Sequence, residues 1–190
     1  MSVRLVTTPR FGDARGWFSE IYNARRFADA GITAEFVQDN HSLSRPRRTL
    51  RGIHFQRPPY AQAKLVRCLR GRIFDVAVDL RRGSPTFARS VGVELSATGG
   101  EQLFVPAGFG HAFLTLEDDC EVAYKVDAYY APESDGGIAW NDDALGIEWP
   151  LVGGDPILSD KDAALPSLAF ADFDFPYDGC PLQLSPMALA

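Results

Sequence analysis

The chain has 190 residues, 46% of them hydrophobic, which is the size and composition of one globular domain with a sizeable core. Its formal net charge of −6 argues against nucleic acid or an anionic membrane as a general partner. The sequence contains no long apolar run and no signal-peptide pattern, and its three cysteines are scattered without metal-ligand spacing. We therefore expect a cytoplasmic protein with free thiols and no membrane span.

The first element that the sequence predicts is a short helix over residues 23–31. The segment NARRFADAG has a helical composition and ends in a glycine, which commonly stops helices. The residues before this helix read as an N-terminal extension that precedes the main fold.

Short strand-like runs dominate the middle of the chain. Two β-rich runs, 64–69 and 72–80, are broken by Arg70 and Gly71, and the second run alternates so that one of its faces is apolar. Further runs, separated by turn residues, cover 91–95, 102–105, 112–116 and 121–126. Strands this short and regular, without helices between them, predict an all-β jelly-roll barrel with its core over about residues 51–130.

After residue 130 the chain turns to Pro, Gly and Asp, with Trp140 and Trp149 as expected anchors. Residues 159–163 read as the capped start of a short helix, because serine is a favoured N-cap. The tail from Phe170 onward is expected to be irregular and packed on the barrel through its aromatic side chains. Since no repeat or low-complexity segment divides the chain, we expect a single domain over residues 1–190.

The three histidines, His41, His54 and His111, first suggest a metal site. The segment PAGFGH, which ends at His111, matches the second half of the metal-binding cupin pattern. The first half needs two histidines one residue apart, which would share one face of a strand, but Gln56 stands where the second should be. The sequence therefore predicts a cupin barrel without a bound metal.

Without a metal, His54 can act as a base, because the unperturbed pKa of histidine, near 6.5, suits proton transfer at neutral pH. Structural packing is the competing interpretation of any single histidine. Around His54, the segment RTLRGIHFQ adds Arg51 and Gln56, and Lys64 opens an otherwise apolar strand. These polar groups would be costly inside a barrel unless they bound something polar, which favours a ligand site.

From Asp13 to about Asp162, the sequence resembles the dTDP-4-dehydrorhamnose 3,5-epimerases. The resemblance rests on long segments in the same order: DARGWFSE, FVQDNHS, LRGIHFQ, QAKLVRCLRG running into FDVAVDLRRGSPTF, VPAGFGHAF, VAYKV and LSDKD. It implies a cupin-type jelly-roll barrel with an N-terminal extension and short C-terminal helices. It also implies a homodimer that converts dTDP-4-keto-6-deoxyglucose to dTDP-4-keto-rhamnose without a metal or another cofactor.

The implied reaction accounts for four of the residues. Protons on carbons 3 and 5 flank a ketone, so removing either leaves an enolate whose charge lies on the carbonyl oxygen. His54 resembles the family base, Asp162 its carboxylate partner, and Tyr124 the acid on the opposite sugar face. Lys64 is placed to stabilise the oxyanion. Tyrosine, with an unperturbed pKa near 10, stays protonated and able to donate.

The remaining candidates are expected to hold the nucleotide and the sugar. Arg51 and Arg15 are the leading diphosphate ligands because guanidinium forks match phosphate geometry, and Lys161 is a weaker candidate. Phe18 and Tyr130 are expected to contact the thymine ring, with core packing as the alternative. Hydrogen bonds to the base or the sugar are expected from Glu20, Gln38, Asn40 and His111.

Three other functions remain open. A single-carbon 3- or 5-epimerase of another deoxysugar pathway would retain every one of these residues. A 3,4-ketoisomerase is disfavoured by the pairing of His54 with a C-terminal aspartate and by Tyr124. A non-catalytic sugar-binding cupin would be expected to have lost the base or the acid, and both are present.

We also expect substrate contacts to cross between the subunits of the homodimer. Arg15, Phe18 and Glu20 all precede the barrel in the chain. An edge strand exchanged with a partner would bury Trp17 and protect the edge of the sheet.

Overall fold

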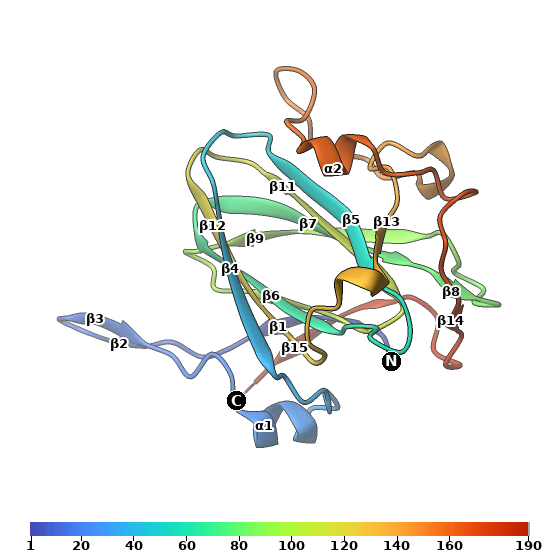
Figure 1. The fold of residues 1–190 in the computed structure, drawn as a ribbon. Helices are drawn as coiled ribbons and strands as arrows, with labels where there is room; N and C mark the ends of the chain where they lie inside the picture. The colour runs from blue at the N-terminus through green and yellow to red at the C-terminus, as the bar shows by residue number, and fades with distance from the viewer. Residues whose placement is uncertain (190) are drawn as a thin grey trace.

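The computed structural model describes residues 1–189, in which two β-sheets face one another (Figure 1). The six-stranded sheet contains, in spatial order, β15 (Leu184–Ala188), β1 (Val3–Thr7), β10 (Gln102–Val105), β6 (Lys64–Arg70), β12 (Cys120–Val126) and β4 (Gln38–Ser44). The five-stranded sheet contains, in the same way, β13 (Asp135–Gly137), β5 (Leu50–Gln56), β11 (Phe109–Thr115), β7 (Arg72–Asp79) and β9 (Ser90–Ser96).

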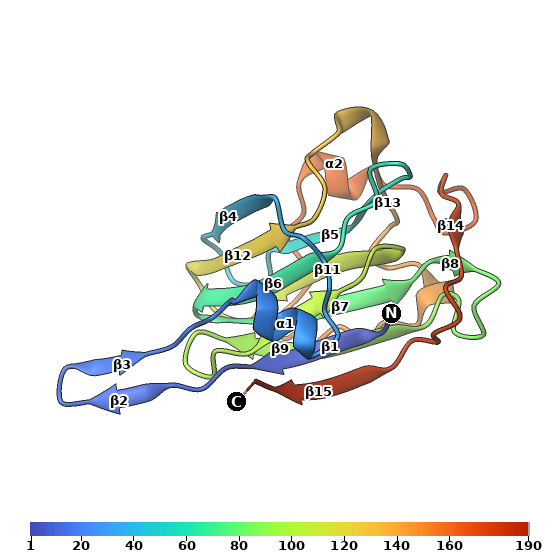
Figure 2. The same cartoon turned by 90° about the horizontal axis from the view of Figure 1, so that it is seen from below.

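The smaller elements lie around these two sheets. A hairpin of β2 (Phe11–Asp13) and β3 (Gly16–Phe18) projects away from the barrel, as Figures 1 and 2 both show. Outside the sheets the chain forms β8 (Arg81–Arg82), β14 (Phe175–Pro176), α1 (Ala24–Asp29), α2 (Asp160–Ala163) and the 3₁₀ turns η1 (Pro132–Ser134) and η2 (Asp143–Leu145). None of the helices within residues 1–189 is long and apolar enough to cross a membrane.

The strands expected in the middle of the chain are present, but the sheets extend beyond residues 51–130. Strands β1, β4, β13 and β15 all come from outside that range. The tail also differs from the expected irregular segment, since β15 pairs in parallel with β1 at the edge of the larger sheet (Figure 2). Pro186 concealed this strand in the sequence, yet proline is tolerated at a sheet edge because no donor is needed on the open side.

Both expected helices form, and both begin at side-chain caps. The Asn23 side chain accepts hydrogen bonds from the first turn of α1, and Ser159 caps α2 in the same way. Phe27 anchors α1 against the outer face of the six-stranded sheet, where it is 1% exposed.

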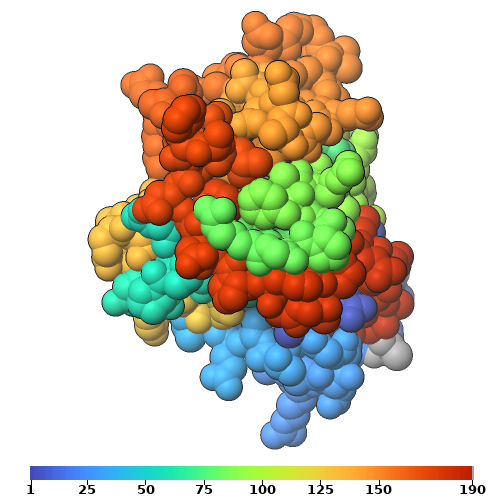
Figure 3. Space-filling model, turned by 90° about the vertical axis from the view of Figure 1, so that its right-hand side faces the viewer, coloured from blue at the N-terminus to red at the C-terminus, as the bar shows by residue number. Residues whose placement is uncertain are grey.

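Apolar clusters occupy the barrel interior and the outer face of each sheet. At one end of the interior, β6, β7, β10 and β12 pack together through side chains such as Val66, Ile73 and Val122. The outer face of the five-stranded sheet is covered by the C-terminal segment through Phe173 and Phe175. In Figure 3 this red segment borders the green loop around β8, with which β14 pairs. The rest of the interior is left for polar side chains.

Strand β7 departs from the alternation expected of a half-exposed strand. Its inward-facing Asp75 and Asp79 are fully buried, like the apolar residues between them. Asp79 accepts hydrogen bonds from Arg81, Ser84 and Thr86, so it organises the loop that follows the strand. The segment DLRRGSPTF therefore has a structural role, because its Asp79–Arg81 ion pair is buried and organises the loop after β7.

Strand β5 contains a bulge that decides which of its side chains face inward. His54 lies opposite His111 on β11, whereas Arg51 lies opposite Phe113, so three steps along β5 match two along β11. This extra residue turns Arg51 and His54 to the same side. Gly52, at the bulge, has a φ of +123°, and a Cβ there would approach the Ala112 Cβ to 2.5 Å.

We predict that Gly52→Ala is strongly destabilising, because the side chain adds both backbone strain and a steric clash inside the sheet. The expected loss of unfolding free energy is roughly 2–6 kcal/mol. Gly153→Ala is the matched control, since Gly153 also has a positive φ of +89° but nothing within 4 Å of its Cβ position. It should lose only about 1–2 kcal/mol. Urea unfolding measures both, and equal losses would contradict the clash.

Candidate active site

Two adjoining cavities of about 280 and 190 Å³ lie between the sheets. Both are lined by His54, Lys64, Tyr124 and Lys161, so they are two parts of one site. The larger part adds Arg51, His111 and Asp162, and the smaller part adds Gln38, Asn40 and Tyr130. The structure thus brings together ten of the thirteen residues that the sequence predicted.

His54 and Asp162 form the closest polar contact in this cavity. His54 Nε2 lies 2.5 Å from Asp162 Oδ1, so the carboxylate accepts a hydrogen bond from this ring nitrogen. That contact fixes the imidazole tautomer and leaves Nδ1 as the atom that can accept a proton. Burial by itself raises the pKa of the Asp162 carboxyl, but hydrogen bonds from His54 and Ser159 and the charge of Lys161 hold this pKa below its usual value.

Lys64 is a cation buried in the barrel wall. It opens β6, is 8% exposed, and its ammonium donates a hydrogen bond to the His54 carbonyl oxygen at 3.5 Å. Burial lowers the pKa of Lys64 to about 8, although the nearby Asp75 and Asp135 carboxylates act in the opposite direction. The cavity therefore holds a positive charge that is poorly solvated and readily stabilises a neighbouring anion.

A second histidine–aspartate pair lies beside the first. His111 Nε2 is 2.7 Å from Asp75 Oδ1, and both side chains are buried. Burial lowers the pKa of His111 more than the neighbouring Asp75 carboxylate raises it, which favours the neutral ring. The sequence analysis missed Asp75 because it interrupts an apolar strand in a way that also suits an exposed face. Only its buried place on a central strand, in contact with His111, reveals its role.

Tyr124 reaches the cavity from the opposite sheet. It lies on β12, where its cross-strand neighbours are Asn40 on β4 and Val66 on β6. Burial raises the pKa of the Tyr124 phenol. The phenol therefore stays protonated at neutral pH and can donate a proton into the cavity.

The remaining lining residues form a polar rim. Arg51 is held by hydrogen bonds to Ser44 Oγ at 3.1 Å and to the Leu43 carbonyl oxygen at 3.2 Å. Lys161 forms an ion pair with Asp135. Gln38 links Asn40 to Tyr130. Its amide nitrogen donates to Asn40 Oδ1 at 2.9 Å, and its side-chain carbonyl oxygen accepts from the Tyr130 backbone N–H at 3.1 Å.

Tyr130 and Phe18 are both exposed, so the core-packing alternative is wrong for each of them. Tyr130 is 57% exposed at the cavity mouth. Phe18 is 69% exposed on the projecting hairpin, together with Arg15, whose guanidinium forms an ion pair with Asp13 on the same hairpin. Glu20, just after the hairpin, pairs with Arg26. Arg15, Phe18 and Glu20 are the three candidates that do not line the cavity of their own chain.

Within residues 1–189, no three His, Cys, Asp or Glu side chains are grouped as metal ligands. His41 lies outside the cavity and pairs with Glu121 at 3.1 Å. The Gln56 amide is occupied by backbone: it donates to the carbonyl oxygens of Tyr60 and Tyr129 and accepts from the Ala131 N–H. The residue at the position of a cupin metal ligand thus ties two loops to the cavity rim.

The comparisons with known proteins agree with one another. The family model described as dTDP-4-dehydrorhamnose 3,5-epimerase matches residues 1–169. A relative of that description in Salmonella typhimurium is 54% identical over 166 residues, which cover 86% of this chain and 90% of the relative. The structure of a Legionella pneumophila dTDP-6-deoxy-D-glucose-3,5-epimerase, in complex with dTDP-4-keto-L-rhamnose, is 41% identical with a TM-score of 0.87, covering 93% of this chain and 100% of that one.

A further solved structure bears on the single-carbon alternative. A 3′-monoepimerase from Streptomyces bikiniensis, in complex with dTDP-quinovose, is 38% identical with a TM-score of 0.80. The match covers 88% of this chain and 83% of that one. Together with the predominance of strands, these structural matches confirm the expected cupin-type jelly roll.

We predict that removing the buried charge of Lys64 makes the protein more stable. Its pKa is about 8 when folded and 10.5 ordinarily, so between these values the unfolded chain binds the extra proton. The free energy of unfolding of the natural chain therefore rises with pH across that window. Lys64→Met should be more stable at pH 7, by about 1 kcal/mol or more, and this advantage should shrink toward pH 10.

Urea unfolding at both pH values measures this difference. Arg70→Met is the control, because Arg70 also lies on β6 and its side chain is exposed at the far end of that strand. A less stable Lys64→Met protein at pH 7 would show that the ammonium is compensated in its site.

Proposed function

The chain belongs to the dTDP-4-dehydrorhamnose 3,5-epimerase family and is a sugar-nucleotide epimerase, and we propose that His54 and Tyr124 are its base and its acid. The resemblance read from the sequence is thereby confirmed. The reaction inverts carbons 3 and 5 of a dTDP-4-keto-6-deoxyhexose, which gives dTDP-4-keto-rhamnose from dTDP-4-keto-6-deoxyglucose. The places of the individual side chains in the cavity support the roles that we propose for them.

The single observation that carries this assignment is that the base and the acid stand on facing sheets. His54 belongs to β5 of the five-stranded sheet, and Tyr124 belongs to β12 of the six-stranded sheet. Both line the same cavity. A sugar ring between the two walls would meet His54 on one face and Tyr124 on the other. Inversion needs this arrangement, because the proton leaves from one face and returns to the opposite one.

Proton removal is assigned to the free nitrogen of His54. The Asp162 carboxylate at Nε2 stabilises the imidazolium that forms when Nδ1 takes a proton from carbon 3 or carbon 5. Lys64, the buried cation next to His54, is assigned to the enolate oxygen. Because its charge is held in place and largely shielded from water, it favours the enolate more than the neutral ketone.

Proton return on the opposite face is assigned to Tyr124, whose raised pKa keeps the phenol protonated between turnovers. The nucleotide is assigned to the polar rim, with Arg51 and Lys161 as ligands of the diphosphate. Tyr130, exposed at the mouth, is assigned to the thymine ring, and Gln38 and Asn40 supply hydrogen bonds to the base or the sugar.

Solvent exchange separates the two proton-transfer roles. His54→Ala should lose turnover and deuterium incorporation at both carbons by about 100- to 10,000-fold, because it removes the base. Tyr124→Phe should let label enter while the inverted product fails to accumulate, since His54 can still return deuterium to the original face. Asp162→Asn should fall between these two. NMR of dTDP-4-keto-6-deoxyglucose in deuterated water measures label and product together.

The binding of dTDP alone serves as the control and should change little in all three variants, because other residues hold the nucleotide. Near-normal exchange at both carbons in His54→Ala would rule out His54 as the base. Label entering at one carbon only in the natural chain would instead favour a single-carbon epimerase, the activity in the name of the Streptomyces bikiniensis protein.

We also propose that the chain acts as a homodimer, in which the β2–β3 hairpin reaches the partner's site. An isolated two-stranded hairpin is marginal in water, and this one exposes Phe11, Trp17 and Phe18. Its Arg15 side chain is 90% exposed, so it is available to an anionic ligand held by another subunit. The free thiol of the exposed Cys180 suits a cytoplasmic location for this assembly.

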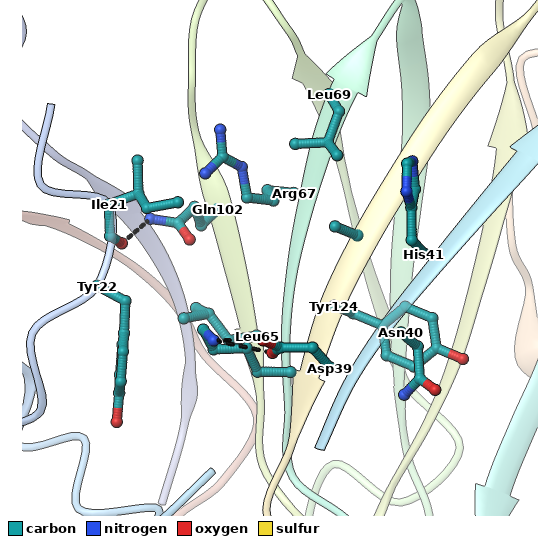
Figure 4. A pocket seen from close by; sticks show the side chains of 12 residues that line it. Ile21, Tyr22, Asp39, Asn40, His41, Leu65, Arg67, Leu69, Gln102 and Tyr124 are labelled. Atoms are coloured by element: carbon teal, nitrogen blue, oxygen red, sulfur yellow. Dashed lines mark hydrogen bonds and ion pairs between the residues drawn. The ribbon is translucent and has the colours of Figure 1, made fainter. Parts of the chain in front are cut away.

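A groove of about 310 Å³ on the outer face of the six-stranded sheet extends this apolar surface (Figure 4). Its lining includes Ile21 and Tyr22, which lie between the hairpin and α1, together with Leu65, Leu69 and Ala123 of the sheet. In a two-fold dimer the same surface is used twice, so hairpin and groove form one self-complementary interface.

Mixing two inactive variants tests whether the sites are shared. One carries His54→Ala, and the other carries Arg15→Ala with Phe18→Ala. In a mixed dimer, the subunit with intact His54 receives intact Arg15 and Phe18 from its partner. Random reassociation should therefore restore about a quarter of the natural activity, since half of the dimers regain one site of two.

The control is each variant alone, taken through the same dissociation and reassociation. Light scattering reports the mass, which should be twice that of the 20.9 kDa chain. An active monomer, or a mixture no more active than its components, would contradict the exchange of hairpins.

A further inference from the structure

Asp162 lies on a segment that is fastened to the barrel on both sides. Before it, the Ile157 N–H donates to the Arg48 carbonyl oxygen at 2.8 Å, and the Leu50 N–H donates to the Ile157 carbonyl oxygen at 3.0 Å. After it, the Pro166 carbonyl oxygen accepts from the Ala139 N–H at 2.8 Å. These backbone bonds hold α2 over β5, but they leave the Asp162 carboxylate free to rotate about its side-chain bonds.

Ser159 supplies the contact that limits this rotation. Its hydroxyl oxygen accepts the Asp162 N–H at 3.1 Å, which is the N-cap bond of α2. The same oxygen lies 3.0 Å from Asp162 Oδ2, where its proton can be donated to the carboxylate. A hydroxyl has one proton and two lone pairs, so both bonds can form together.

The two carboxylate oxygens are therefore divided between two partners. Oδ2 accepts from Ser159, and this directs Oδ1 toward His54 Nε2. Asp162 is 5% exposed, so few water molecules can replace a missing partner. A water in the place of the hydroxyl could satisfy Oδ2, but it would not be tied to the helix and would leave the orientation of the carboxylate undefined.

We propose that Ser159 is a positioning residue for the epimerisation, which fixes the Asp162 carboxylate so that it holds the His54 imidazole in the tautomer and orientation of the base. This inference rests on the proposed function of His54. Ser159 and Asp162 form the S-x-x-D pattern of a helix cap, so the local rule that starts α2 also orients the dyad. The helix cap and the catalytic carboxylate thus share one hydroxyl group.

The test compares Ser159→Ala with Ser159→Thr. Ser159 lines the cavity, but its hydroxyl is already bonded to Asp162 and has no further proton to donate to a ligand. Removing the hydroxyl should therefore lower kcat by about 10- to 100-fold with little change in KM. Threonine keeps the hydroxyl, and the exposed position has room for its methyl group, so it should restore most of kcat. The downfield proton resonance of the His54 ring N–H, assigned by its absence in His54→Ala, should persist in Ser159→Thr and weaken or shift in Ser159→Ala.

The control for lost helix capping is Asp142→Ala. Asp142 caps η2 in the same C-terminal region by accepting from the Ala144 N–H, and it lies outside the cavity. This variant should lose stability without losing kcat. Unchanged kcat and an unchanged His54 resonance in Ser159→Ala would overturn the positioning role, while losses in His54→Ala and Asp162→Asn would leave the proposed function intact. If His54→Ala itself stayed active, the failure would lie with the proposed function.

Discussion

The hydrogen bond between His54 and Asp162 joins residues that are 108 positions apart, and the site depends on it. His54 is built into a central strand, whereas Asp162 sits on a four-residue helix that would not persist without the barrel beneath it. The chain after residue 130 therefore has to return to β5 before Asp162 can pair with His54, the proposed base. Its backbone bonds to residues 48, 50 and 53 accomplish that return. Folding and catalysis are linked here through one contact.

The buried charged groups that suit the cavity to proton transfer also lower the stability of the folded protein. Lys64 keeps its charge in a place where burial lowers its pKa to about 8, and Asp75 keeps one carboxylate oxygen without a partner among the described residues. Both features weaken the folded state. They are offset by the apolar clusters at the far end of the barrel and outside both sheets. The same water-poor surroundings would make the fixed Lys64 charge effective in stabilising a developing enolate.

Sequence reasoning found the central strands, both helices, the Ser159 cap and ten of the residues that meet in the cavity. It found them because alternation, a helix-stopping glycine, a serine cap and family segments are local signals. It could not place Asp75, because its role depends on which face of β7 is directed into the barrel, where it contacts His111. It also missed β15, because the strand is defined by its pairing with β1 at the other end of the chain. Arg15, Phe18 and Glu20 lie outside the cavity of their own chain, and the expectation that they reach a partner's cavity stays a proposal.

The bulge in β5 has a consequence for how this strand could change. Alternation has a period of two, so an unbroken strand would place Arg51 in phase with Ile53 and Phe55, which pack into the outer apolar cluster. The extra residue shifts the alternation by one position. The Arg51 guanidinium and the His54 imidazole therefore both face the barrel interior. A single deletion at this point would send Arg51 to the outside while leaving His54 in place. The chain would keep the proposed base and lose a proposed ligand of the diphosphate, so a single-residue deletion could lower substrate affinity while leaving the proton-transfer group in place.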